Sequence, residues 1–183
     1  MLVLIVGPSG AGKDTLLDAA RNQFAADPRV HFIRRAITRP ETAGGEAHEA
    51  LTPAAFAERL AAGGFVLSWQ AHGLSYGIPA AIVDDLARRH LVVVNASRAV
   101  IAQAAERFPT RVIEITAPPE MLAARLGLRG REDAADIAAR IARDVQLPPG
   151  VDMERVMNDA SPEEGIARFL AALSRAAEYA RQS

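Results

Sequence analysis

Residues 2–15, LVLIVGPSGAGKDT, carry the strongest indication of the fold in this chain. Its first part, Leu2 to Val6, is entirely apolar, which is typical of a central parallel strand buried on both faces. A glycine-rich turn follows, and from Lys13 the spacing of apolar residues predicts a helix that runs to Phe24. A strand, a glycine-rich turn and a helix in this order form the context in which backbone amides bind phosphate groups.

The turn matches the phosphate-binding template G-x-x-x-x-G-K-[ST] at Gly7, Gly12 and Lys13. Glycines let successive N–H groups point inward, the helix N-terminus adds partial positive charge, and the lysine ammonium reaches the outer phosphates of a nucleotide. The alternative is a glycine-rich turn without a ligand. We expect ATP to bind at Gly7, Pro8, Ser9, Gly10, Ala11, Gly12, Lys13, Asp14 and Thr15.

Asp14 stands where the template has a hydroxyl residue that holds Mg²⁺. A carboxylate is also a hard oxygen ligand, so one interpretation is that Asp14 binds Mg²⁺, directly or through water. The other is that Asp14 stabilises the helix N-terminus, where acidic residues are favoured, and that Thr15 supplies the hydroxyl. The sequence alone leaves both interpretations open.

Further strands and helices alternate along the chain. Strands are predicted at 31–37, 65–70, 91–94, 111–116 and 155–158, a turn at 71–79, and helices at 53–60, 79–88, 99–107, from about 119, and at 162–179. Strands that alternate with helices indicate an α/β fold with a central parallel sheet. In such folds, ligands bind at the C-terminal ends of the strands.

Length and composition limit the class of protein. A chain of 183 residues, 50% of them hydrophobic, is long enough for one domain with a sizeable core. A formal net charge of -1 argues against a general nucleic-acid-binding protein. The chain has no cysteine and no apolar run of membrane-spanning length, and a first strand that begins at Leu2 leaves no room for a signal peptide. We therefore expect a cytoplasmic protein without nucleic-acid or membrane partners, and leave open whether it forms a homodimer.

A series of short motifs resembles, in order and over nearly the whole chain, the landmarks of the guanylate kinases. They are GPSGAGK (7–13), ITRP (37–40), GGE (44–46), GGF (63–65), HGLSYG (72–77), RLGLRGRED (125–133) and VMND (156–159). The resemblance implies a P-loop nucleoside-monophosphate-kinase-like three-layer fold with a central parallel sheet, an acceptor-binding arm and an arginine-bearing lid. Within a single domain of residues 1–183, we expect the core at 1–33, 79–124 and 146–183, the arm at about 34–78 and the lid at about 125–145.

Several positions that read guanine in guanylate kinases are changed here. By the resemblance, a base-contacting hydroxyl becomes Arg35, the base-reading glutamate becomes Gln70, and an acidic motif becomes Asn95-Ala96-Ser97. A pocket without these carboxylates cannot accept the N–H donors of guanine. These departures and the stretch SWQAHGLSYGIP (68–79) resemble instead the ribose 1,5-bisphosphate phosphokinases of bacterial phosphonate breakdown. That resemblance implies transfer of the γ-phosphoryl group of ATP to ribose 1,5-bisphosphate, which gives 5-phospho-α-D-ribosyl 1-diphosphate.

A phosphate acceptor is already ionised, so cations should dominate the site and no general base is needed. Arg35 is expected on the same strand face as Arg39, four residues later, because side chains alternate with period two. The catalytic residues implied are Lys13, Arg125, Arg129 and Arg140. The substrate-binding residues expected are Arg35, Arg39, Glu46, Gln70, His72, Tyr76, Asn95 and Ser97.

Plainer structural roles stand beside these assignments. Arg35 is alternatively a solvated strand residue, and the lid arginines alternatively form a charged helix surface. His72 alternatively holds its turn. Trp69 is expected in the core, with Gln70 facing the pocket. His31 and His90 are expected to be surface residues at the edges of their elements.

The sequence leaves two other functions open. One is a kinase for another phosphorylated metabolite or sugar, or a guanylate kinase. The other is a non-catalytic guanylate-kinase-like module that binds proteins, against which the intact Gly7, Gly12 and Lys13 argue, because such modules usually lack a working phosphate loop.

Overall fold

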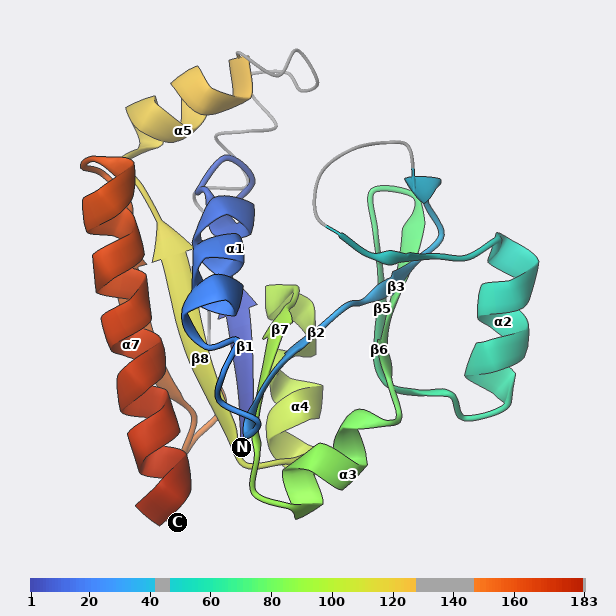
Figure 1. The fold of residues 1–183 in the computed structure, drawn as a ribbon. Helices are drawn as coiled ribbons and strands as arrows, with labels where there is room; N and C mark the ends of the chain where they lie inside the picture. Colours follow the sequence, from blue (N-terminus) through green and yellow to red (C-terminus); the bar gives the residue numbers. More distant parts are fainter. Residues whose placement is uncertain (42–46, 128–146, 183) are drawn as a thin grey trace.

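The structure is a computed structural model that describes residues 1–41, 47–127 and 147–182. Within this part of the chain, the main sheet has five parallel strands in the order β2-β7-β1-β8-β9 (Figure 1). Their bounds are β1 Leu2–Val6, β2 Val30–Ile33, β7 Leu91–Asn95, β8 Thr110–Thr116 and β9 Asp152–Met157. β1 lies in the middle and is buried along its whole length, as its unbroken apolar sequence predicts.

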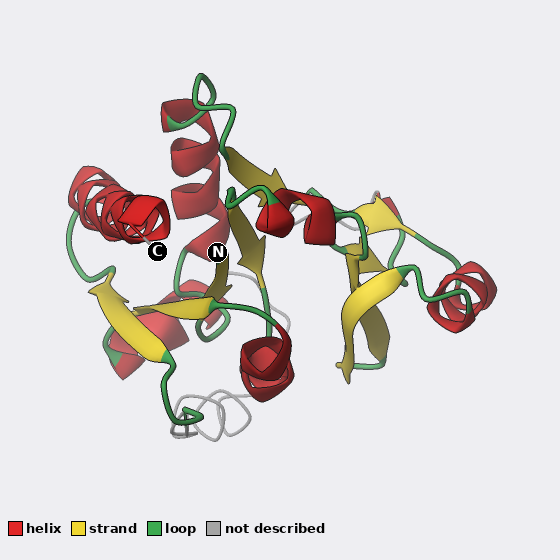
Figure 2. Cartoon of the chain, turned by 90° about the horizontal axis from the view of Figure 1, so that it is seen from below, coloured by secondary structure: helices red, strands yellow, loops and turns green. Residues whose placement is uncertain are grey.

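The two faces of β1 belong to two separate clusters of the core. Val3 and Ile5 pack with α1 and α7, whereas Leu4 and Val6 pack on the opposite face. Helices therefore cover both sides of the sheet, as Figure 2 shows from below, and the predicted three-layer α/β fold is confirmed. The helices are α1 Lys13–Gln23, α3 Ile82–Ala87, η2 Arg98–Val100, α4 Ile101–Arg107, α5 Pro119–Gly127 and α7 Pro162–Gln182.

A second, smaller sheet lies to one side of the main sheet (Figure 1). It has the order β4-β3-β6-β5, with β3 Ala36–Ile37, β4 Glu49–Ala50, β5 Phe65–Ala71 and β6 Leu74–Pro79. Helix α2 (Pro53–Ala61) covers it, and Phe56 of this helix stacks on Phe65 with ring centroids 4.7 Å apart. The hydroxyl oxygen of Thr52 accepts from the amide of Ala55, which is the N-cap that the sequence predicts.

Three predicted elements differ from the observed ones. The strand predicted at 31–37 is divided, because β2 ends at Ile33 in the main sheet and β3 begins at Ala36 in the second. The segment 71–79, predicted as a turn, is mostly strand β6. The helix predicted from Pro79 begins at Ile82.

A search of the helices in the described ranges finds none with both the length and the hydropathy needed to cross a membrane.

Candidate functional site

The glycine-rich loop leaves the C-terminal end of β1 and leads into α1. Gly7 has a φ of 146°, and a Cβ atom there would overlap the carbonyl oxygen of Ile115 in β8. Gly12, the N-cap residue of α1, has a φ of 85° and offers no side chain to the first amides of the helix. The N-terminus of this helix attracts an anion, which its first amides can bind.

Lys13 lies across this loop. Its ammonium nitrogen donates to the carbonyl oxygens of Gly7 and Pro8, each at 2.9 Å. Both contacts are neutral acceptors, which a phosphate oxygen can replace with a charge-assisted partner. Lys13 is thus held against the loop, and phosphate binding by it stays a prediction.

Arg125, at the end of α5, reaches the same loop from the other side. Its guanidinium donates to the carbonyl oxygen of Asn158 at 3.1 Å and to that of Gly10 at 3.5 Å. The structure therefore brings Arg125 together with Lys13 around the phosphate loop, and a catalytic role for either stays a prediction. Arg129, Arg140 and Glu46 lie outside the described residues.

Asn158 is a site residue whose role the sequence does not single out. Its side-chain amide nitrogen donates to the carbonyl oxygen of Ala11 at 2.8 Å, and the residue is only 8% exposed. The next residue, Asp159, accepts from Arg168 of α7, and this hydrogen bond lowers the pKa of the Asp159 carboxyl below its ordinary value. The end of β9 is thereby fixed both to the loop and to α7.

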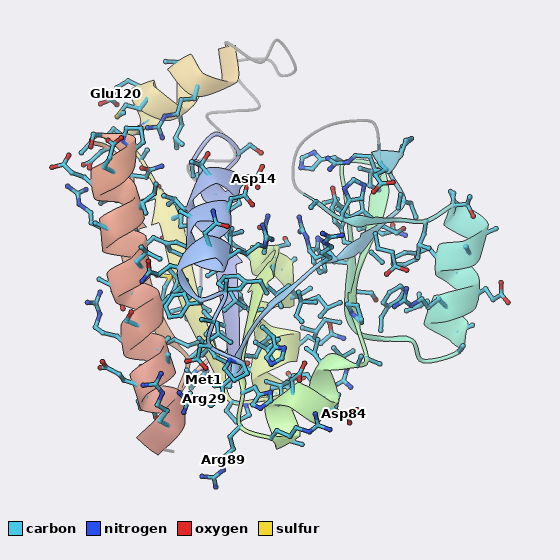
Figure 3. The ribbon with its side chains drawn as sticks, viewed as in Figure 1. Met1, Asp14, Arg29, Asp84, Arg89 and Glu120 are labelled. Atoms are coloured by element: carbon cyan, nitrogen blue, oxygen red, sulfur yellow. The ribbon has the colours of Figure 1, made fainter. Side chains whose placement is uncertain are left out.

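The expected magnesium ligand lies in the first turn of α1. Asp14 is partly buried, whereas the next residue, Thr15, is exposed. In Figure 3 the labelled Asp14 lies near the N-terminal end of α1, beside the loop. A carboxylate at this place has the hard oxygen donor that Mg²⁺ prefers, so the residues present fit the ion.

Two of the expected acceptor residues lie at the C-terminal end of β7. Asn95 is the last residue of that strand, is 9% exposed and pairs with Ile5 of β1, so it lies next to the strand that carries the loop. Ser97 caps η2, because its hydroxyl oxygen accepts from the amide of Ala99 at 3.2 Å. The structure gives Ser97 this local role, and substrate binding by it stays a prediction.

Arg39 is fixed by a partner that the sequence does not reveal. Its guanidinium donates to Nδ1 of His48 at 3.3 Å, and Nε2 of His48 lies 3.1 Å from the carbonyl oxygen of Arg39. Because a guanidinium only donates, Nδ1 must accept and Nε2 must carry the hydrogen. Among the described residues, the buried Nε of Arg39 has no hydrogen-bond partner.

Arg35 lies over an aromatic pair on the second sheet. Trp69 and Tyr76 face each other across β5 and β6 and stack with centroids 5.2 Å apart. The guanidinium carbon of Arg35 is 5.5 Å from the Trp69 ring and 5.2 Å from the Tyr76 ring. The two rings therefore hold the cation in place. Arg35 and Arg39 do not share one strand, because β3 between them contains only Ala36–Ile37, so the expected strand-face argument is wrong.

Gln70 and His72 lie apart from this group. Gln70 follows Trp69 in β5, so its side chain points to the opposite face of the sheet from Arg35 and Tyr76, and it is exposed. Trp69 is partly buried and packs against the core cluster that contains Val92 and Val94 of β7. The Trp69 face is therefore the one turned toward the main sheet. His72 is exposed at the tip of the β5–β6 hairpin with a φ of 53°, which fits a turn residue.

A buried ion network at the end of β8 also escapes the sequence patterns. Glu114 is only 3% exposed and accepts from Arg98 at 2.7 Å and from Arg155 at 2.8 Å. A buried glutamate inside an apolar strand is a signal that a cation must lie nearby. The network joins η2, β8 and β9 at the end of the sheet that carries the loop.

Known proteins resemble this chain over most of its length. Ribose 1,5-bisphosphate phosphokinase PhnN of Acidiphilium cryptum (strain JF-5) is 51% identical over 174 residues, which are 95% of this chain and 92% of that protein. PhnN of Methylobacterium radiotolerans is 50% identical and covers 94% of this chain and 96% of its own. The bifunctional ribose 1,5-bisphosphokinase-thymidine phosphorylase of Azorhizobium caulinodans is 51% identical, and the chain spans 25% of its length. No protein-family model matches the chain.

Solved structures share the fold at low identity. Guanylate kinase from Anaplasma phagocytophilum superposes with a TM-score of 0.64 at 17% identity, over 97% of this chain and 86% of that one. A gluconokinase from Sinorhizobium meliloti 1021 superposes with a TM-score of 0.54 at 21% identity, over 97% and 93%. Because the PhnN relatives are half identical over nearly the whole of both chains, the chain belongs to the family of ribose 1,5-bisphosphate phosphokinases and is a kinase with a guanylate-kinase-like fold.

Proposed function

We propose that this protein transfers the γ-phosphoryl group of ATP to ribose 1,5-bisphosphate, giving 5-phospho-α-D-ribosyl 1-diphosphate and ADP. The observation that carries the proposal is the 50% identity, over 94% of this chain and 96% of the relative, to a protein named for this substrate. An oxygen of the acceptor's 1-phosphate forms a bond to the γ-phosphorus, and the bond to the oxygen bridging to the β-phosphate breaks. The acceptor oxygen is already ionised, so the reaction needs no general base.

The phosphate loop and the two cations at it bind the donor. Backbone amides at the start of α1 hold the phosphates, and Lys13 exchanges its two carbonyl partners for phosphate oxygens. Arg125, already against the loop, neutralises charge on the transferring group, and we assign the same role to Arg129 and Arg140. We further propose that Asp14 holds Mg²⁺, which on binding neutralises part of the triphosphate charge.

The second sheet binds the acceptor. Arg39, oriented by His48, and Arg35, held on Trp69 and Tyr76, supply one guanidinium for each phosphate of a bisphosphate. Asn95, Ser97 and Glu46 remain proposed substrate-binding residues, of which Asn95 has the strongest support from its position. Gln70 and His72, which lie apart from Arg35 and Tyr76, are not proposed to contact the acceptor. Two anions brought together require cations on both sides, which this arrangement supplies.

We also propose the division into core, arm and lid at the bounds predicted from the sequence, and a location in the cytoplasm without nucleic-acid partners. Analytical ultracentrifugation decides between a monomer and a homodimer.

Phosphorus NMR of reactions with MgATP and single acceptors tests the proposed activity. Ribose 1,5-bisphosphate should give a new diphosphate signal together with ADP, and its kcat/KM should exceed those of guanosine monophosphate and gluconate by at least about 100-fold. Lys13→Ala should abolish turnover while leaving the circular dichroism spectrum unchanged. Guanosine monophosphate as the best acceptor would assign the protein to the guanylate kinases by activity as well as by fold. Full activity of Lys13→Ala would contradict the proposed donor site.

A further inference from the structure

Two histidines and an aspartate meet at the end of the main sheet opposite to the phosphate loop. His31 lies near the start of β2, His90 immediately precedes β7, and Asp85 lies in α3. β2 and β7 are paired and parallel, so both histidines lie at the N-terminal ends of neighbouring strands. In Figure 3, the labelled Asp84 and Arg89, which flank this part of the chain, lie at the other end of the molecule from Asp14.

The three side chains lie close together. The imidazole rings stack with centroids 4.9 Å apart and an interplanar angle of 7°. Nδ1 of His31 is 3.8 Å from one carboxylate oxygen of Asp85, and Nδ1 of His90 is 3.4 Å from the other. One ligand atom from each residue can be chosen so that all three lie within 4.8 Å of one another.

Direct hydrogen bonding among these groups is weak. The His90–Asp85 contact is a long hydrogen bond of 3.4 Å, and the 3.8 Å between His31 and Asp85 is beyond hydrogen-bond range. Two ligand atoms each about 2.1 Å from a tetrahedral zinc ion are about 3.4 Å apart. Each histidine nitrogen lies at or slightly beyond this separation from one of the two carboxylate oxygens of Asp85, and the single set of three ligand atoms lies within 4.8 Å, so a small adjustment of the side chains brings them around one ion.

The backbone around α3 places His90 beside Asp85. Arg89 adopts a φ of 60°, its amide donates to Leu86, and the amide of His90 donates to Asp85 at 2.9 Å. These two hydrogen bonds form a Schellman motif at the C-terminus of α3, in which the amide of His90 donates to the carbonyl oxygen of Asp85. Those two side chains are usually apolar partners, whereas here they are an imidazole and a carboxylate. Arg89 also takes a backbone conformation that favours glycine, so the turn is held against local strain.

The remaining ring nitrogen of His31 has the partner that a metal-binding histidine needs. Nε2 of His31 lies 2.9 Å from the carbonyl oxygen of Pro28, so Nε2 carries the hydrogen and Nδ1 keeps its lone pair toward Asp85. A backbone carbonyl on the far nitrogen fixes the tautomer and raises the basicity of the ligating nitrogen. Arg29, two residues before His31, forms an ion pair with Asp27 at 3.2 Å.

We propose that His31, Asp85 and His90 bind a divalent transition-metal ion of the zinc class, with two imidazole nitrogens and one carboxylate oxygen as ligands. This ligand set suits Zn²⁺ and its neighbours and not Mg²⁺, which prefers oxygen ligands only. The side chains of the three residues are 20–35% exposed, so the ion can reach them from solvent and keep a water as a further ligand. The ion fastens α3 to the two strands at this edge, and the site is distinct from the magnesium site proposed at Asp14.

Zinc titration of the chelator-treated full chain, followed by calorimetry, tests the proposal. Zn²⁺ alone should bind with one equivalent at this site and raise the melting temperature by about 5 °C at a hundredfold excess over its dissociation constant. His31→Gln, Asp85→Asn and His90→Gln should each weaken this binding by at least about 100-fold, the upper end of what outer-shell changes cause. Asp84→Asn, a neighbouring aspartate on α3, and His72→Gln, an exposed histidine elsewhere, are the matched controls and should change it little.

The outcome does not depend on kinase activity, so it stands apart from the proposed function. Co²⁺ used in place of Zn²⁺ should give the visible absorption of a four-coordinate site in the wild type and lose it in Asp85→Asn. Each variant's fold is checked by circular dichroism without metal, and if one variant is unfolded the other two decide. Zinc binding that survives all three substitutions, or that Asp84→Asn weakens as much as Asp85→Asn, overturns the proposal.

Discussion

The side-chain amide nitrogen of Asn158 donates to the carbonyl oxygen of Ala11 across 2.8 Å and so ties the end of β9 to the phosphate loop. The side chain fits between two residues that lack Cβ atoms, because a Cβ at either Gly12 or Gly165 would overlap its amide group. Asn158 therefore positions the loop without being part of the phosphate-loop motif.

Replacing Asn158 with alanine should lower the free energy of unfolding by about 1–3 kcal/mol, since the buried carbonyl oxygen of Ala11 loses its donor. The affinity for MgATP should fall as the loop loses its support. Urea denaturation measures the first effect and calorimetry the second. Asn22→Ala, an exposed asparagine near the end of α1, is the matched control and should stay within about 0.5 kcal/mol of the wild type. Equal effects of the two substitutions would show that the contact does not support the loop.

Gly7→Ala should be among the most destabilising single changes in the loop. Gly7 and Gly63 both have positive φ values, but only at Gly7 would a Cβ meet backbone atoms, those of Ile115. We expect Gly63→Ala to cost about 1–2 kcal/mol from backbone strain alone, and Gly7→Ala to cost more than about 3 kcal/mol or prevent folding. Thermal and urea unfolding compare the two. A Gly7→Ala protein as stable as Gly63→Ala would contradict the close packing of β8 against the loop.

Arg35→Ala should raise the KM for the bisphosphate acceptor by about 10- to 100-fold and leave the KM for ATP nearly unchanged, because a charge-assisted contact to one phosphate is lost. Arg34→Ala is the matched control, since Arg34 is the adjacent arginine and is exposed. Steady-state kinetics with each substrate varied separately make the measurement. A change in melting temperature without a change in acceptor KM would mean that Arg35 only stabilises the aromatic pair.

Asp14→Ser should restore the hydroxyl of the general motif, whereas Asp14→Ala should leave neither ligand. If Asp14 holds Mg²⁺, the concentration of Mg²⁺ at half-maximal rate should rise by about 10-fold or more in Asp14→Ala and less in Asp14→Ser. Thr15→Ala tests the other interpretation. An unchanged Mg²⁺ requirement in Asp14→Ala, with a raised one in Thr15→Ala, would assign the ligand to Thr15.

The pKa of Asp159 should lie below that of an ordinary aspartate, because Arg168 donates a hydrogen bond to its carboxylate. A carboxyl whose pKa is lowered by folding stabilises the fold above its ordinary pKa and loses that contribution as the pH falls through the lowered value. Carbon NMR titration of the carboxyl groups should show the Asp159 pKa rising in Arg168→Gln. Arg175→Gln, which removes a cation paired with Glu154, should leave it in place. An Asp159 pKa unmoved by Arg168→Gln would disprove the assigned cause.

The sequence was sufficient for the parts of the fold that local patterns determine. The apolar run Leu2–Val6, the loop and α1 are where the pattern predicts them, because a doubly buried strand and a glycine turn leave few alternatives. The segment 71–79 was misread because glycine and proline suggest a turn, while the true turn is only His72-Gly73 and the rest continues as β6. The hairpin lets Trp69 and Tyr76 stack, a contact that no local pattern contains.

The site residues divide in the same way. The loop residues follow from a motif, and the proposed acceptor residues rest on family resemblance. The contact of Arg39 with His48 depends on the pairing of β3 with β4, and that of Asn158 with Ala11 joins residues far apart in the chain. Such contacts exist only after the sheets have formed, so residue spacing could not have predicted them. The break at Arg34 and Arg35, where the chain passes from one sheet to the other, was equally invisible in an otherwise strand-like segment.

That break has a consequence for substrate choice. The chain enters the second sheet after Ile33 and leaves it after Pro79, so Arg35, Arg39 and Tyr76 are all carried by one small unit with two covalent connections to the main sheet. The spacing among these groups is set inside that unit and does not depend on its tilt. If these groups bind the acceptor as proposed, the distance between the acceptor's own charged groups decides whether it fits, and the tilt of the unit sets only how near it comes to the nucleotide.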